Sequence, residues 1–437
     1  VANTEVTSLL EARQSKLIGF EVQEESVIKS LRLESIQSDI SLVKSKFTGS
    51  TSLWNIETTR SLTLNHNNFE GTFDVKASRI KGFFIHGDTF NRKAKLENRD
   101  DSGQNIISNL NEVYITEANF IEGFEFDGMG KELIKLTLPL SPNFQGILRF
   151  VGWKIQETIL SGVNVKLKLV FKRISFKRLI LNDFANYGDI TFERSSAEKE
   201  AFKTEEDPDS SIIANDSDLG LTRFSEFDFD SFDFISLDNV SFDGIVASNV
   251  NWFDDSKIRI EPSGQPNSQS FRRRREVYRQ IKQSLRSKGN QIDSLIFQAR
   301  EMKAYRNELR AIGKNYKKRD RILMTVNQTN DYGINWWKPI KIIVIITFVF
   351  YIIQLPLFSK KIDYTIAKDL NDLILTFSEF WNNFEVFWQM FNPARRFSSV
   401  YNTNEGAWLY FLDFSHRVIL GIFIFQIIRA FRRLASK

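Results

Sequence analysis

Residues 227–250 read FDFDSFDFISLDNVSFDGIVASNV, and the apolar positions in this stretch decide the fold. Phe227, Phe232, Leu237 and Phe242 follow one another at intervals of five residues. This spacing fits neither an α-helix, with about 3.6 residues per turn, nor a β-strand, whose side chains alternate with a period of two. It indicates a solenoid whose coil has about four faces of about five residues, each with one apolar side chain pointing inward.

A longer repeat supports this interpretation. Phe47, Phe69 and Phe90 lie 22 and 21 residues apart, close to the length of one such coil. Phe47 and Phe69 begin the similar tripeptides FTG and FEG, and Phe144 and Phe242 begin FQG and FDG. We therefore expect β-coils over residues 36–255 with five phenylalanines buried: Phe69, Phe120, Phe144, Phe232 and Phe242. The alternative is a β-sandwich with phenylalanine-rich strands.

The segments around the coils have a different texture. Residues 1–35 carry Leu9, Leu10 and Leu17 among charges, which predicts an N-terminal helical or capping segment. Residues 256–270 contain SGQPNS and are predicted to be a linker. Residues 271–335 follow as a basic α-helical hairpin and a juxtamembrane segment. Its two helices are expected at Phe271–Ser287 and Gln291–Ile312, separated by Lys288 and Gly289.

Charge changes sign between neighbouring regions. Residues 200–260 hold 15 acidic and 4 basic side chains, whereas residues 271–321 hold 5 acidic and 17 basic ones. The acidic region is read as a solvated face, in preference to a nucleic-acid mimic. The basic hairpin is expected to bind lipid headgroups, and nucleic acid is an unlikely partner. The residues predicted for this role are Arg272, Arg273, Arg274, Arg275, Lys317, Lys318, Arg319 and Arg321.

The last hundred residues have the composition of a membrane domain. Residues 342–358 carry no charge, and a second apolar stretch ends the chain. Residues 336–437 are therefore predicted to form a two-span transmembrane domain, with spans at about 339–358 and 408–431. Lysines and arginines concentrate before the first span and after the second. The solenoid and both termini are accordingly expected on the cytoplasmic side.

The connection between the two spans contains aromatic residues at steps of three and four. This predicts an amphipathic or re-entrant helix over residues 369–391, ended by Asn392 and Pro393. It either lies flat at the membrane interface or dips between subunits as a pore helix. The sequence after Phe391 lacks the glycine-rich filter of potassium channels. The aromatic residues are Phe377, Phe380, Trp381, Phe384, Phe387, Trp388 and Phe391.

The second span carries three ionisable residues on one helical turn. Asp413, His416 and Arg417 lie at positions i, i+3 and i+4, about 9–15 Å along the helix from Ala407. Ionisable groups at such depth face a partner or water. The first interpretation is an Asp413–Arg417 salt bridge along the helix. The alternative is functional, either a polar ring around an oligomer axis or a proton-sensing His416.

The five-residue registers, the helical hairpin and the two final spans together resemble bacterial pentapeptide-repeat membrane proteins, with phenylalanine replacing the usual leucine and insertions such as residues 194–220. The resemblance covers roughly residues 40–437. It implies a right-handed quadrilateral β-helix and a bacterial inner membrane. The family supplies no catalytic residues to transfer.

Composition limits the chemistry that this chain can perform. It contains no cysteine and three histidines, and no nucleotide-binding or hydrolase motif occurs. We therefore expect no enzyme activity, no metal site and no cofactor. The expected function is a membrane-anchored cytoplasmic solenoid that regulates an oligomeric two-span assembly, either channel-like or membrane-perturbing. The alternative is a passive membrane-tethered scaffold that binds a cytoplasmic protein on the solenoid.

Overall fold

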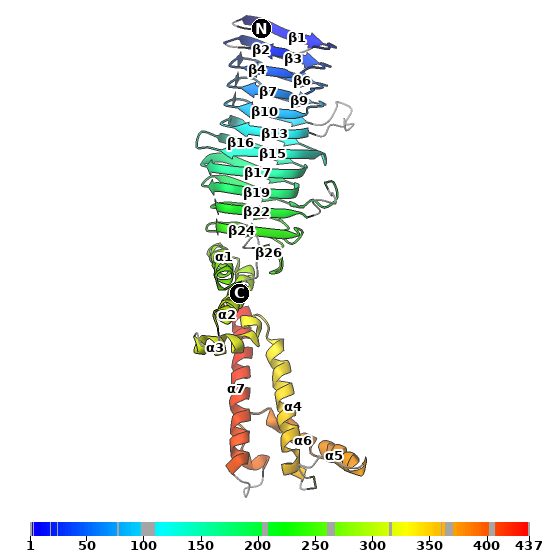
Figure 1. Cartoon of the computed structure of the whole chain (residues 1–437), viewed down its shortest axis with the longest axis vertical. Coiled ribbons are helices and arrows are strands. Elements are labelled where there is room, and N and C mark those ends of the chain that lie inside the picture. The colour runs from blue at the N-terminus through cyan, green and yellow to red at the C-terminus, as the bar shows by residue number, and fades with distance from the viewer. Residues whose placement is uncertain are drawn as a thin grey trace. The chain divides into compact units, whose positions relative to one another are not determined.

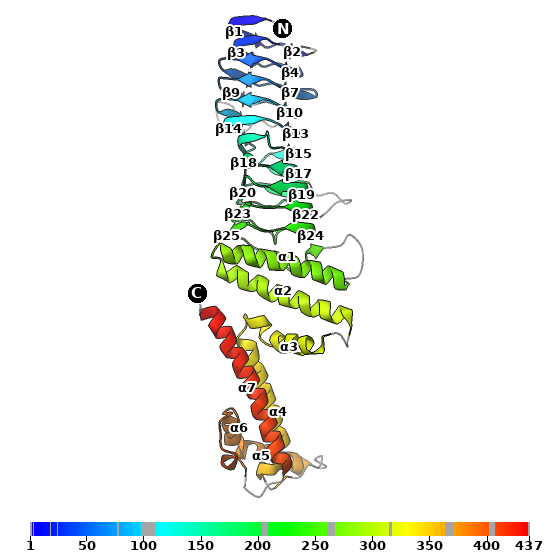
Figure 2. The same cartoon turned by 90° about the vertical axis from the view of Figure 1, so that its left-hand side faces the viewer.

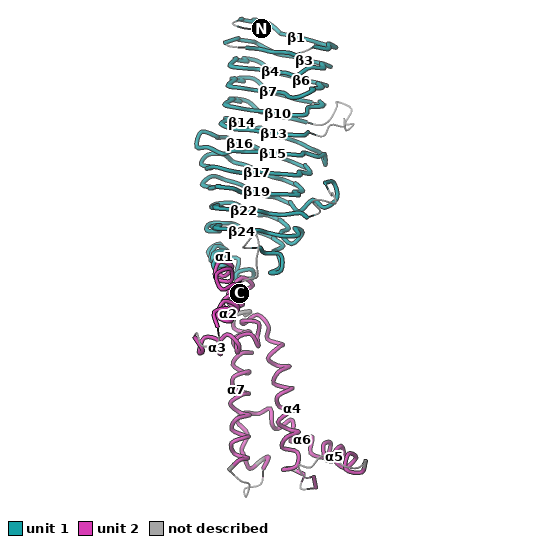
Figure 3. The backbone as a smooth tube through the Cα atoms, in the orientation of Figure 1, with its two compact units in different colours: residues 1–266, 276–294 teal, residues 267–275, 295–437 magenta. Residues whose placement is uncertain are grey.

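The computed structural model describes residues 2, 4–17, 19–23, 25–76, 78–97, 110–202, 209–259, 267–313, 317–359, 361–362, 370–401 and 407–435. The chain divides into two compact units, shown in different colours in Figure 3. The first contains Val1–Pro266 and Glu276–Ser294. The second contains Asn267–Arg275 and Leu295–Lys437.

The first unit is a parallel β-solenoid of about 11 turns, whose coils stack along one axis (Figures 1 and 2). Its described strands form two parallel sheets, one of 14 strands and one of 12. The larger sheet contains β1 (Glu5–Arg13), β3 (Val27–Glu34), β5 (Lys46–Phe47), β6 (Thr51–Trp54), β8 (Asn68–Phe69), β9 (Phe73–Lys76), β11 (Thr89–Phe90), β12 (Ala94–Glu97), β14 (Asn119–Asp127), β16 (Gln145–Val151), β18 (Lys166–Lys172), β20 (Asp189–Glu193), β23 (Arg223–Ser225) and β25 (Val246–Ser248). The smaller sheet contains β2 (Phe20–Val22), β4 (Ile40–Val43), β7 (Ser61–Asn65), β10 (Gly82–His86), β13 (Leu110–Thr116), β15 (Glu132–Leu140), β17 (Lys154–Asn164), β19 (Ser175–Asn186), β21 (Ser196–Ala197), β22 (Ser211–Asp218), β24 (Phe234–Ser241) and β26 (Ile258–Arg259).

Each coil pairs with the next in the register that the phenylalanine repeat predicts. Phe47 on β5 pairs with Phe69 on β8, and Phe69 pairs with Phe90 on β11. Early coils use short segments. One coil, for example, consists of the short strands β4, β5 and β6 and of Glu57, which forms a single-residue bridge with Arg79 of the next coil. Later coils use longer strands such as β17 and β19. All these pairings are parallel, so the β-sandwich alternative is wrong.

Stacked phenylalanine rings fill the inside of the coils. Ring centroids of Phe47, Phe69 and Phe90 follow one another at 4.8 Å, and a second column passes from Phe150 to Phe171 at 5.6 Å and on to Phe192 at 5.0 Å. Aromatic pairs of this kind contribute about 0.5–1.5 kcal/mol beyond their buried area. The five phenylalanines predicted to be buried are 0–4% exposed, which confirms that expectation.

Polar side chains inside the solenoid form a hydrogen-bonded ladder from coil to coil. The backbone N–H of Ser45 donates to Oδ1 of Asn67 over 3.0 Å, and the side-chain amide of Asn67 donates to Oδ1 of Asp88 over 2.8 Å. The ladder satisfies groups that would otherwise be costly to bury. Burial raises the pKa of the Asp88 carboxyl to about 7.

The N-terminal region corrects one sequence expectation. Residues predicted to form a helical segment instead belong to β1, β2 and β3, so the described coils begin well before residue 36. In β3, Ile28, Leu31 and Leu33 point inward, and Leu31 pairs with Thr51 of the next coil. That pairing supplies the backbone hydrogen bonds that a helix would have made internally.

The last coil is covered by the part of α1 (Ser268–Ser287) from Glu276 onward and by the start of α2 (Gln291–Ile312). Within the first unit, the Ser284 hydroxyl donates to the carbonyl of Phe242 over 2.7 Å, and the Tyr278 hydroxyl donates to Asp255 over 2.7 Å. The Trp252 indole donates to Asp293 over 3.1 Å. The predicted helical hairpin is thus present, with α1 beginning three residues earlier than expected. Of the linker predicted at residues 256–270, residues 260–266 lie outside the described residues, Ile258–Arg259 form β26, and α1 already begins at Ser268.

The second unit contains two long apolar helices, α4 (Trp337–Ser359) and α7 (Ala407–Ala435), which pack side by side (Figures 1 and 2). Two stretches, Trp337–Leu357 and Trp408–Arg432, are long and apolar enough to cross a membrane. Before α4 come α3 (Lys318–Gln328), which the sequence analysis did not predict, and the short η1 (Asp331–Gly333). Between α4 and α7 lie α5 (Leu370–Asn382), α6 (Phe384–Met390) and η2 (Phe397–Ser399).

The amphipathic helix expected over residues 369–391 is therefore two helices rather than one. The break falls at Asn383, whose backbone leaves the helical region with φ −103° and ψ 10°. The side-chain amide of Asn383 donates to the backbone carbonyl of Glu379 over 2.8 Å, in competition with the helical ladder. The predicted end before Pro393 is confirmed, because α6 stops at Met390.

Candidate functional sites

A buried ionic cluster links α7 to the segment that follows α6. The Asp413 carboxylate accepts a hydrogen bond from the guanidinium of Arg395, and its second oxygen lies 2.6 Å from Nε of Arg417. The side chains of Arg395 and Asp413 are 3% and 4% exposed, whereas that of Arg417 is 24% exposed. The predicted Asp413–Arg417 pair is confirmed, and Arg395 is a third member that the sequence analysis did not place there.

Backbone carbonyls hold Arg395 in position. Nη1 of Arg395 donates to the carbonyl of Met390 over 2.7 Å, and Nη1 of Arg417 donates to the carbonyl of Arg395 over 2.7 Å. The turn at Asn392 ends α6 and directs the chain toward α7. The cluster therefore ties the connection to the second span with charged and neutral hydrogen bonds together.

Two further polar contacts involve α4 and α7. The Thr347 hydroxyl of α4 lies 3.3 Å from Nε2 of His416, and both residues are fully buried. The Tyr401 hydroxyl donates to the side-chain carbonyl of Gln354. Burial and the nearby Asp413 carboxylate raise the pKa of Tyr401 to about 12, so this hydroxyl remains a donor. Asp413 and His416 of α7 thus lie in the protein interior.

The predicted aromatic residues divide into two groups. Phe380, Phe384 and Phe387 pack against Tyr351 of α4, with ring centroids 5.3–6.3 Å from the tyrosine ring. Phe391 joins the same cluster, whereas Phe377, Trp381 and Trp388 are 54–66% exposed. Leu373 and Ile374 of α5 are similarly exposed. A helix with so much uncovered apolar surface fits a membrane interface, where tryptophan is enriched.

A second polar contact fastens α5 to the end of α4. The Glu379 carboxylate accepts hydrogen bonds from the Ser359 hydroxyl over 2.8 Å and from the Lys361 ammonium over 2.9 Å. These hydrogen bonds, that from Lys361 foremost, lower the pKa of Glu379. The contact holds α5 against the C-terminal end of α4.

The basic residues expected to bind lipid headgroups differ in how they are engaged. Arg275 is engaged internally, because it pairs with Glu308 at 2.9 Å and lies over the Tyr305 ring at 4.9 Å. Arg321 donates to the carbonyl of Gly313 over 2.7 Å. By contrast, Lys318 and Arg319 are exposed and make no hydrogen bond or ion pair with another described residue. Among the others, Arg272, Arg273 and Lys317 are exposed and Arg274 is half-buried.

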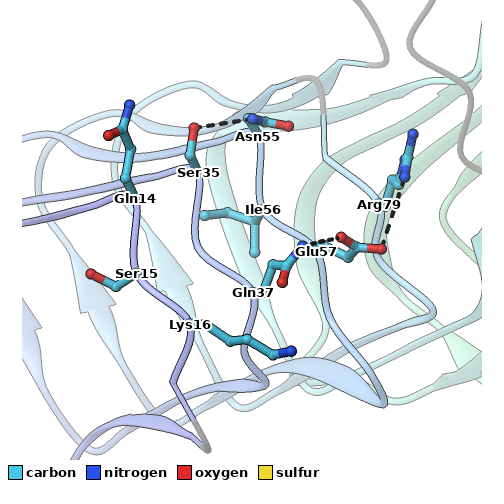
Figure 4. Close-up of a pocket in the computed structure, with 9 residues that line it drawn as sticks. All are labelled: Gln14, Ser15, Lys16, Ser35, Gln37, Asn55, Ile56, Glu57 and Arg79. Carbon is cyan, nitrogen blue, oxygen red and sulfur yellow. Dashed lines mark hydrogen bonds and ion pairs between the residues drawn. The ribbon is translucent and has the colours of Figure 1, made fainter.

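The solenoid carries its own candidate site, an open groove of about 620 Å³ on the early coils (Figure 4). Side chains from successive coils line it: the Asn55 amide donates to the Ser35 hydroxyl of the preceding coil over 3.0 Å. The Gln37 amide donates to Glu57 over 2.9 Å, and Arg79 lies 3.9 Å from that carboxylate. The Ser35–Asn55 and Gln37–Glu57 hydrogen bonds form two polar columns on the exposed surface, whereas the ladder through Asn67 is buried.

The acidic side chains of the late coils largely support turns. Asp228 accepts hydrogen bonds from the Ser231 backbone at 3.1 Å and the Asn251 amide at 2.8 Å. Asp230 pairs with Lys257 at 3.0 Å, and Asp233 accepts from Ser210. Hydrogen bonds from Ser210 lower the pKa of Asp233 against the opposing effect of burial. These roles favour the structural reading of the acidic region.

No protein-family model, curated protein or solved structure matches this chain. Among the described residues no group of three or more acidic or histidine side chains has the arrangement of a metal site.

Proposed function

We propose that this chain is a membrane-anchored scaffold, in which α4 and α7 hold a β-solenoid at the membrane surface and the solenoid binds a protein partner. The observation that carries this proposal is that Asp413 and His416 of α7 find partners within the same chain. Asp413 is satisfied by two arginines, and His416 faces Thr347. Charged groups in a bilayer require such partners, and here they need no second subunit to supply them.

The groove in Figure 4 is the proposed partner surface. Its columns of Ser35 and Asn55, and of Gln37 and Glu57, run from coil to coil along the solenoid. Lys16 also lines the groove, and its ammonium makes no hydrogen bond or ion pair with another described residue. An extended polypeptide segment with an acidic side chain opposite Lys16 fits this arrangement of donors and acceptors.

A second candidate function is the regulation of an oligomeric, channel-like or membrane-perturbing assembly. Two features favour it. The cluster holds two guanidinium groups and one carboxylate, and the side chain of Arg417 is 24% exposed. The Arg417 guanidinium, which reaches the surface of α7, is available to line an oligomer axis. In either case we propose a bacterial inner membrane, with the solenoid and both termini in the cytoplasm. The charge distribution and the resemblance to pentapeptide-repeat membrane proteins support this placement.

Reconstitution of the full chain separates the two candidates. The scaffold proposal expects liposomes that contain the protein to show no anion or cation flux above protein-free liposomes. It also expects the Arg417→Glu variant to insert less well, since a second carboxylate would replace a partner of Asp413. A flux whose ion selectivity changes in Arg417→Glu, together with a defined oligomer in native mass spectrometry, would refute the scaffold proposal and establish the channel-like one.

A further inference from the structure

The face of α3 that is turned toward α7 leaves an apolar groove of about 600 Å³ open to the surroundings. Ile322 and Leu323 line it from α3, and Val418, Ile422 and Phe425 line it from α7. These five side chains are 42–67% exposed. A groove of this kind is unfavourable in water, so it requires an occupant.

A positive charge lies at the rim of this groove. Arg319 is one of its lining residues, and neither Arg319 nor the adjacent Lys318 has a partner among the described residues. The neighbouring charged residues of α3 are engaged elsewhere, Asp320 with the Tyr305 hydroxyl at 2.8 Å and Arg321 with the Gly313 carbonyl. The groove thus combines an apolar floor with a cation that has no counter-ion.

The groove extends along α7 from the middle of the second apolar stretch toward its C-terminal end. Val418 and Phe425 belong to the stretch Trp408–Arg432, which is apolar enough to span a bilayer. Trp336, just before α4, packs against Phe431 with ring centroids 5.2 Å apart, so the groove ends near a pair of aromatic rings. Tryptophan and arginine side chains mark the headgroup level of transmembrane helices.

We propose that this groove binds one anionic phospholipid. An acyl chain lies along Val418, Ile422 and Phe425, and the guanidinium of Arg319 binds the phosphate, with Lys318 beside it. Charge complementarity selects the anionic headgroup, because a guanidinium forms paired hydrogen bonds with phosphate oxygens. This inference rests on the proposal that α4 and α7 span a membrane.

Native mass spectrometry of the full chain, titrated with phosphatidylglycerol or phosphatidylcholine in detergent, tests the proposal. The wild type is expected to retain one phosphatidylglycerol at a lower lipid concentration than phosphatidylcholine. Arg319→Gln should weaken phosphatidylglycerol binding about fivefold and leave phosphatidylcholine binding unchanged, since one cation near an anionic lipid contributes about 1 kcal/mol. Arg432→Gln removes an exposed charge outside the groove lining and should change binding less than twofold.

A second variant tests the apolar floor. Gly421 lines the groove, and a Cβ atom built on it meets nothing within 4 Å. Gly421→Leu should therefore fit the helix, occupy the groove and abolish retention of both lipids. The proposal is overturned if Gly421→Leu retains phosphatidylglycerol like the wild type, if Arg432→Gln acts as strongly as Arg319→Gln, or if Gly421→Leu converts a dimer to a monomer. Extraction of the wild-type chain by alkaline carbonate would instead refute the membrane anchor itself.

Discussion

The substitution Asp413→Asn tests whether the buried ionic cluster holds α7 and the segment that follows α6 together. Two guanidinium groups share this one carboxylate, and Asp413 is almost fully buried. Removing one partner of a buried ion pair costs about 3–5 kcal/mol, because the remaining charge stays desolvated. Arg395 and Arg417 keep their hydrogen bonds to the carbonyls of Met390 and Arg395. We therefore expect the lower end, a loss of about 3 kcal/mol in the free energy of unfolding.

The measurement is equilibrium unfolding in mixed micelles at increasing dodecyl sulfate, followed by helical circular dichroism. Glu385→Gln is a matched control, because Glu385 is exposed on α6 and its change should stay within about 0.5 kcal/mol. The double variant Arg395→Gln with Asp413→Asn should lose at least about 2 kcal/mol less than the sum of the single changes, since it removes both charges. An Asp413→Asn variant as stable as the wild type, or strictly additive effects, would refute the reasoning.

Three further outcomes are expected. Phe232→Ala should reduce the solenoid's free energy of unfolding in urea by about 3–5 kcal/mol, because it is a large-to-small change at a fully buried site. The control Tyr187→Ala, at a side chain that is 62% exposed, should change it by less than about 0.5 kcal/mol. The pKa of Asp88 is raised from 3.8 to about 7, so between these pH values the folded solenoid holds a proton that the unfolded chain loses. The free energy of unfolding should therefore fall as pH rises from about 4 to about 7 and level off above. Asp88→Asn should flatten this slope, and an unchanged slope would assign it to other groups. In this cysteine-free chain, an impermeant maleimide added to intact spheroplasts should label Ser398→Cys and spare Tyr187→Cys; the opposite pattern would reverse the proposed topology.

The coils could be predicted from sequence because their signal is local. Each coil repeats an inward apolar side chain at short intervals, and Phe69 and Phe232 are buried as that pattern requires. The first coils carried no such signal. Leu9 and Leu10 fit a helix as well as a strand, and only the pairing of Leu10 with Leu31 on the next coil decides between them. A pairing between coils is a long-range event, which local propensity does not specify.

The same limit applies to the polar cluster. The Asp413–Arg417 pair is four residues apart on one helix, so helical geometry alone predicts it. Arg395 lies 18 residues before Asp413, and Tyr401 lies 47 residues after Gln354. These partners depend on how the connection folds back onto the spans. A useful sequence signal would have been charge balance, because one carboxylate in a span with arginines on either side calls for more than an intrahelical pair.

The buried ladder of the solenoid and the buried ionic cluster of the second unit are both partnered within the chain, and this separates the parts that stabilise from the parts that bind. In the solenoid, Asn67 and Asp88 bind each other in the internal ladder. In the second unit, Asp413 binds two arginines. Groups that are satisfied in this way have no capacity left for a ligand. Lys16 in the solenoid groove and Arg319 beside α7 are charged, accessible and without a partner among the described residues. Binding should therefore be sensitive to substitutions at these two residues and insensitive to the buried ladders, which act on stability instead.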